Sequence, residues 1–64
     1  MLVQYIARVK QPNDTIERPF NNFALAKLWI DGFLQNNTIG EIEERKRNAY
    51  GLLIETNIRY FYPL

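Results

Sequence analysis

The chain has 64 residues, of which 47% are hydrophobic and 14% aromatic, and 8 basic side chains against 7 acidic ones leave a net charge of +1. This length suits a single small domain spanning residues 1–64, and the apolar content excludes a disordered chain. The charge balance argues against a protein that coats nucleic acid through a strongly basic stripe. The sequence contains no Cys, His or Ser, which removes disulfides, thiolate or imidazole metal ligands and a Ser–His or Cys–His nucleophile. We therefore expect a protein with no catalytic activity, no metal and no cofactor.

The sequence also bears on location and assembly. No stretch approaches the roughly 18 apolar residues of a membrane span, and residues 1–5 lack the charged segment and apolar core of a secretory signal. We expect a cytoplasmic protein, and the small size and frequent Asn and Ile suggest a phage or plasmid gene. A domain this short has a thin stability margin, which oligomerisation can widen.

A β-hairpin is predicted at the N-terminus. Residues 2–10 alternate between an apolar face and a mostly polar one; the first holds Val3, Tyr5, Ala7 and Val9, and the second holds Gln4, Ile6, Arg8 and Lys10. Residues 11–14 have turn chemistry, and residues 15–20 read as the returning strand. Pro19 cannot donate to a ladder, so this second strand is expected at a sheet edge.

A helix is predicted over residues 23–35, with Asn21 or Asn22 as its N-cap. Its polar positions are Lys27, Asp31 and Gln35, which form one narrow stripe. The apolar side chains cover more of the circumference than packing on one small sheet requires. Either later segments of the chain cover this surplus, or a second copy does so about a two-fold axis.

The second half of the chain is harder to assign. Thr38 and Glu41 match a capping box, which predicts a short second helix ending near Asn48, although a strand over residues 38–47 is an alternative. Residues 49–62 are β-rich and form either two short strands or one strand with a bulge. The expected fold is α+β, in the order ββααβ(β). Its small antiparallel sheet, made of the N-terminal hairpin and a C-terminal strand or hairpin, packs against one long and one short helix.

One family resemblance rests on Tyr5-Ile6-Ala7-Arg8-Val9, Pro19-Phe20, Ala26 and Trp29. Residues 4–34 resemble the AP2-like arm-binding N-terminal module of phage and transposon integrases, in which a three-stranded sheet packs on one helix. The resemblance implies a DNA-facing sheet with Arg8, Lys10 and Arg18 as contacts. Two features depart from that family, because the remaining β segment follows the helix here and Glu17 lies on the DNA side. The alternative is that these charges are simply solvated on an exposed face.

The aromatic run Tyr60-Phe61-Tyr62 is the most informative feature for function. Consecutive strand residues alternate between faces, so the three rings cannot all enter one core. They either bind a partner, together with Trp29 and Phe33 of the helix, or Tyr60 and Tyr62 flank the core with wet hydroxyl groups while Phe61 covers a loop. Stacking on the bases of a single-stranded nucleic acid is a further alternative. We expect a non-catalytic interaction protein, a homo-oligomeric inhibitor or adaptor that binds another protein. The alternatives are a DNA-binding module and an oligomer that sequesters a small ligand.

Overall fold

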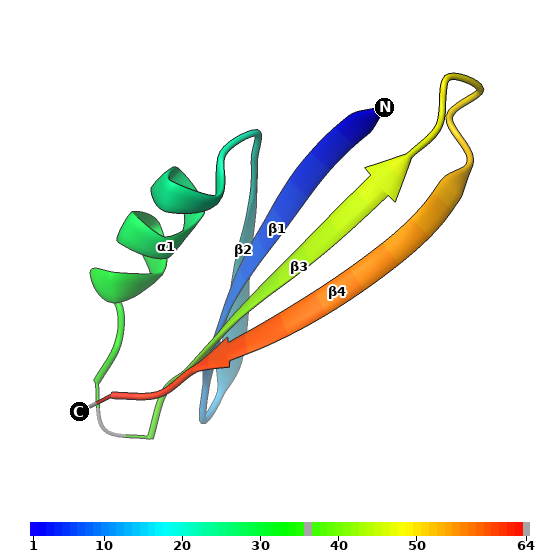
Figure 1. The fold of residues 1–64 in the computed structure, drawn as a ribbon. Helices are drawn as coiled ribbons and strands as arrows, with labels where there is room; N and C mark the ends of the chain where they lie inside the picture. The colour runs from blue at the N-terminus through cyan, green and yellow to red at the C-terminus, as the bar shows by residue number, and fades with distance from the viewer. Residues whose placement is uncertain (36, 64) are drawn as a thin grey trace.

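A computed structural model describes residues 1–35 and 37–63 as a four-stranded antiparallel sheet with one α-helix on one of its faces (Figure 1). The elements are β1 (Leu2–Gln11), β2 (Asp14–Phe20), α1 (Phe23–Asp31), β3 (Ile39–Arg47) and β4 (Leu53–Phe61). The sheet order is β2-β1-β3-β4, so β1 and β3 are central and β2 and β4 are the two edges. The α+β class holds, but the predicted order ββααβ(β) with two helices is wrong, because the described elements run ββαββ.

The predicted N-terminal hairpin is confirmed. β1 pairs with β2 from Tyr5↔Phe20 to Gln11↔Asp14, and β2 lies at a sheet edge as Pro19 requires. On β1, Ala7 and Val9 are fully buried beneath the helix. The alternation of apolar and polar residues therefore fixed this hairpin and the face that it turns to the core.

The helix begins where predicted and ends earlier. The side chain of Asn22 accepts hydrogen bonds from the backbone N–H groups of Ala24 at 2.7 Å and Leu25 at 3.2 Å, which confirms it as the N-cap. The helix ends at Asp31 instead of residue 35, with Gly32 as its C-cap. Glycine disfavours continued helix, and the chain turns there toward β3.

The predicted short second helix does not form. Residues 39–47 are strand β3, hydrogen-bonded to β1 on one side and to β4 on the other, as the alternative reading had it. Ile42 points into the core and is 2% exposed. Glu41 is buried on the opposite face, where its carboxylate accepts a hydrogen bond from Arg8 and does not cap a helix. Two neighbouring strands overrode the local helix signal, because strand formation depends mainly on its context in the sheet.

The C-terminal β segment is one strand, β4, whose register against β3 shifts between Lys46 and Arg47. This confirms the bulged strand and excludes the two short strands with a turn between them. The shift leaves Ile54 without a partner on β3, so Leu53 and Glu55 lie opposite neighbouring residues of β3 and point to different faces of the sheet. The joined ends of β3 and β4 extend beyond the helix (Figure 1).

The core lies between α1 and the sheet. Its buried members are Ala7, Val9, Ala26, Ile30 and Ile42. Gly40 of β3 permits the close approach of the helix, because a Cβ atom there would collide with Cγ2 of Ile30. On the outer side of α1, Leu25 and Leu28 are 56% and 69% exposed, so the predicted apolar surplus of the helix is present.

Candidate protein-interaction surface

The β4 edge, defined as residues 53–60 of β4, is the most open part of the sheet. β4 pairs only with β3 among the described residues, and every residue of the β4 edge is exposed. The opposite edge strand, β2, carries Pro19 and is contacted by α1. A long strand with unpaired N–H and C=O groups is a ready template for pairing with another chain.

Large apolar side chains line the β4 edge. Ile54, Ile58 and Tyr60 are 56%, 46% and 53% exposed. Ile58 lies opposite Glu43 and Tyr60 opposite Glu41, so both point to the face of the sheet that the helix leaves open. Apolar groups that stay this exposed together on an edge strand mark a site for a partner more often than scattered single exposures do.

The β4 edge carries one acidic and one basic side chain, Glu55 and Arg59, on the helix side of the sheet. The carboxylate of Glu55 lies 2.9 Å from Nζ of Lys46 and accepts a hydrogen bond from Nδ2 of Asn57 at 3.0 Å. The bond from Lys46 holds the pKa of Glu55 below its usual value, so this carboxylate stays charged at neutral pH. The guanidinium of Arg59 sits 5.2 Å from the ring centroid of Phe23.

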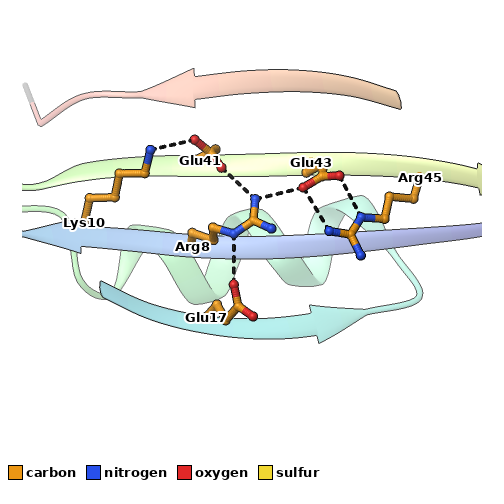
Figure 2. A network of polar contacts seen from close by, with 6 residues as sticks. All are labelled: Arg8, Lys10, Glu17, Glu41, Glu43 and Arg45. Atoms are coloured by element: carbon orange, nitrogen blue, oxygen red, sulfur yellow. Dashed lines mark hydrogen bonds and ion pairs between the residues drawn. The ribbon is translucent and has the colours of Figure 1, made fainter. Parts of the chain in front are cut away.

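A network of charged side chains occupies the open face of the sheet (Figure 2). Arg8 is its centre and lies 2.9 Å from Glu17, 2.7 Å from Glu41 and 2.9 Å from Glu43. Lys10 adds a contact to Glu41 at 3.0 Å, and Nε of Arg45 donates to Glu43 at 2.6 Å. These ion pairs tie β1, β2 and β3 together, and the side chain of Glu41 within them is buried.

The network shifts the pKa values of its members. Burial raises the pKa of Glu41, but the hydrogen bonds from Lys10 and Arg8 outweigh it, so the pKa is lowered. The pKa of Glu43 is lowered chiefly by the hydrogen bond from Arg45. Burial lowers the pKa of Arg8, yet its three carboxylate partners raise it overall. All three side chains are therefore charged at neutral pH and hold one another in place.

The three cations predicted for DNA contact do not share one surface. Arg8 and Lys10 lie on the open face and are engaged by carboxylates. Arg18 lies opposite Ala7, on the helix side, with its guanidinium 5.4 Å from the ring centroid of Phe20. Phosphate binding by this group would require the first two cations to leave carboxylate partners that already neutralise them.

The five aromatic residues predicted to bind a partner are divided by the fold. The rings of Trp29 and Phe33 contact each other at a tilt of 58° with centroids 4.9 Å apart, and both pack against the core, as does Phe61. Tyr60 and Tyr62 remain exposed, at 53% and 63%. The aromatic run therefore provides two exposed rings, Tyr60 and Tyr62, whereas Trp29 and Phe33 are both partly buried.

Two open grooves border β4. One, with a volume of about 420 Å³, is lined by Tyr5, Phe23, Ile42, Glu44, Asn57, Ile58 and Arg59. The other is lined by Lys27, Asp31, Leu34, Gln35, Tyr60, Phe61, Tyr62 and Pro63. Among the described residues, no group of three or more acidic side chains is placed to hold a metal ion. Both grooves lie beside the exposed residues of β4.

Sequence reasoning found Tyr60 but missed Ile58, Glu55 and Arg59. Their importance follows from the position of β4 at the edge of the sheet, which depends on the pairing of distant strands. The alternating pattern of residues 55–60 was the available signal, and the alternative of two short strands within residues 49–62 obscured it.

Comparison with known proteins found no match among protein-family models, curated proteins or solved structures. The resemblance to the integrase module therefore stays a prediction. No helix within residues 1–35 and 37–63 has the length and apolar character that crossing a membrane requires.

Proposed function

We propose that the chain is a non-catalytic protein-binding module whose interaction surface is the β4 edge. The observation that carries this proposal is a nine-residue edge strand that exposes Ile54, Ile58 and Tyr60 and contains neither proline nor lysine. Proteins commonly protect such strands with Pro, Lys or a covering segment. An edge kept open and apolar is suited to β-strand addition, in which the partner contributes a further strand.

The mechanism that follows is occlusion or recruitment by strand pairing. Backbone hydrogen bonds to β4 would supply affinity, and the side chains of Ile58 and Tyr60 would anchor the partner on the open face. A few buried anchors commonly dominate such interfaces, at about 2 kcal/mol or more each. The charge network supports this role by tying β1, β2 and β3 together beside the anchors.

Site-specific photo-crosslinking in the native host tests the proposal. A photoreactive residue in place of Ile58 should give β4-dependent adducts with protein, whereas the same residue in place of Thr15 should not. Thr15 is the matched control, because it is exposed on the other edge strand. Equal labelling from both edges, or no protein adduct from position 58, would contradict the proposal. Fractionation of the same cells tests the accompanying proposal of a cytoplasmic location.

The DNA-binding alternative has weaker support. It uses Arg8, Lys10 and Arg18, of which the first two are paired with carboxylates and the third lies on the other face. Specific and non-specific binding to duplex DNA both require several Lys or Arg side chains that are available to phosphates, and the affinity falls steeply as the salt concentration rises. Fluorescence anisotropy with labelled duplex and single-stranded DNA at low salt should show no saturable binding, and salt-sensitive binding lost in the Arg8→Ala/Lys10→Ala variant would revive this alternative.

A further inference from the structure

We infer that the partner of the β4 edge is a second copy of the chain, paired antiparallel about a two-fold axis that passes beside Asn57. The inference rests on the proposed function, since it names the occupant of the same strand. The resulting dimer has one continuous sheet of two four-stranded halves, with both helices on the same side. The argument comes from the symmetry of strand pairing and from the charges of β4.

Symmetry restricts the registers that two copies of β4 can adopt. A two-fold axis that relates adjacent antiparallel strands stands perpendicular to the sheet, so it keeps each face of the sheet on its own side. Residues directly opposite each other then point to the same face, and one residue of β4 lies opposite its own copy. Choosing that central residue fixes every other pair.

The charged residues of β4 select among these registers. A centre at Glu55 or at Arg59 places like charges directly opposite each other, which is destabilising. A centre at Thr56 or Ile58 leaves both charges opposite neutral side chains. Only a centre at Asn57 places Glu55 opposite Arg59 of the other copy, and the symmetry makes this favourable pair twice.

The uncharged residues agree with the same centre. With Asn57 opposite itself, Thr56 faces Ile58 across the junction, and Tyr60 reaches the bulged end of the other β4, where Ile54 is exposed. Thr56, Ile58 and Tyr60 point to the open face in each copy, opposite Arg45, Glu43 and Glu41 of their own β3. The exposed apolar side chains of the two β4 edges thus meet each other, which removes from water the groups that the single chain leaves exposed.

The existing contacts of the two charges are compatible with this pairing. Glu55 already contacts Lys46 of its own chain at 2.9 Å, so the arriving Arg59 extends a row of alternating charges on the helix side. Arg59 keeps its position above the ring of Phe23, where its carbon stem is anchored. The junction therefore needs no buried charge without a partner.

A charge-exchange experiment tests the dimer by sedimentation equilibrium, from micromolar to millimolar protein. The wild-type chain should be a dimer that dissociates on dilution. Glu55→Arg and Arg59→Glu each turn two attractive pairs into two repulsive ones, and each should weaken dimerisation about tenfold or more. The double variant restores both pairs and should recover the dimer, and an equimolar mixture of the single variants should form a heterodimer. If a single reversal loses the fold by circular dichroism, Glu55→Gln or Arg59→Gln replaces it, with a smaller weakening.

A cysteine experiment tests the register, since the natural chain contains no Cys. The Cβ atoms of opposite residues in an antiparallel pair lie about 4.5–5.5 Å apart, whereas diagonal neighbours lie about 7–8 Å apart. Asn57→Cys should therefore form a disulfide-linked dimer under mild oxidation much faster than Thr56→Cys, whose own copy lies on the diagonal. Equal rates for the two variants would overturn the register.

The outcomes separate this inference from the proposed function. A chain that stays monomeric at millimolar concentration, or a dimer indifferent to every charge reversal, overturns the self-pairing. The proposed function would still stand in that case if the photoreactive residue at position 58 labelled a different protein. Absence of any adduct from position 58 in the host would overturn both.

Discussion

The two edges of the sheet are built in opposite ways, although both strands are long and both end near the helix. β2 contains Pro19, contacts α1 and packs Phe20 against Trp29 with ring centroids 5.9 Å apart. Its Glu17 is tied to Arg8 at 2.9 Å. β4 has no proline, and its only half-buried residue is Phe61. The chain thus protects one edge and leaves the other available, which is the pattern expected where one edge binds a partner.

The largest expected effect is a loss of folding stability on truncating a side chain of the packed strand β3, compared with the same change on the neighbouring edge strand β4. Ile42 is 2% exposed and fills the core beneath α1, so Ile42→Ala should destabilise the fold by about 3 kcal/mol through lost burial and a cavity. Ile58→Ala should change the unfolding free energy by no more than about 0.5 kcal/mol. Urea denaturation of dilute protein measures both.

In so small a domain Ile42→Ala can abolish the cooperative transition altogether. Ile42→Val, expected to cost about 1 kcal/mol, then provides a measurable value on the same scale. Equal losses for the alanine variants at positions 42 and 58 would show that β4 belongs to the core and that the contrast between the strands is wrong.

A second large loss of stability is expected when the charge network that ties β2 to β1 and β3 is broken. Arg8→Leu removes the cation shared by three carboxylates and leaves Glu41 buried with Lys10 alone, so a loss of about 3 kcal/mol is expected. Arg18→Leu is the matched control, because Arg18 is an exposed arginine of β2 that contacts the ring of Phe20. Its cost should be near 0.5 kcal/mol.

Chemical denaturation of the two arginine variants gives this comparison directly. A cost at position 8 no larger than that at position 18 would mean that the ion pairs of the open face do not hold β1, β2 and β3 together.

The hairpin and the helix start were predictable because their signals are local. The alternation of residues 2–10, the turn at residues 11–14 and the N-cap Asn22 all act over a few residues. β3 was not predictable in this way. Glu41 pairs with Arg8, which lies 33 residues earlier in the chain, while its sequence neighbours imitate a capped helix with acidic residues before basic ones.

The candidate surface was predictable only in part for the same reason. The sequence pointed to Tyr60 and Tyr62, which are exposed, and to Phe61, Trp29 and Phe33, which pack around the core. Which rings stay outside depends on where α1 crosses the sheet. Which strand is left at the edge depends on the pairing order, and no local pattern encodes that order.

A moderate effect is expected from pH. The pKa values of Glu41 and Glu43 are lowered in the folded state. The same carboxylates in the unfolded chain have the ordinary glutamate pKa of about 4.3 and therefore bind protons at a higher pH than the folded ones. Their contribution to stability is therefore complete above that value and is lost as the pH falls through the folded pKa values. The melting temperature should therefore fall as the pH is lowered below about 4.3, the ordinary pKa of an unfolded glutamate.

Glu41→Gln supplies the control for this titration, because an amide has no proton to gain. The variant should be less stable at neutral pH and should lose less stability on acidification than the wild-type chain. Parallel curves for the two proteins would show that the acid sensitivity arises elsewhere.

The smallest effect on folding is expected at the centre of the open edge, where the effect on association should be large. Ile58→Lys places on β4 the residue that commonly guards exposed edge strands, and at a position 46% exposed it should change the unfolding free energy of dilute protein by no more than about 0.5 kcal/mol. The same substitution at Thr15, on the edge already protected by Pro19, should leave both stability and association unchanged. Sedimentation equilibrium should instead show that Ile58→Lys removes association at β4, because a lysine there must lose water or leave the strand when a partner approaches. If the two lysine variants associate equally well, the difference between the two edges has no role in binding.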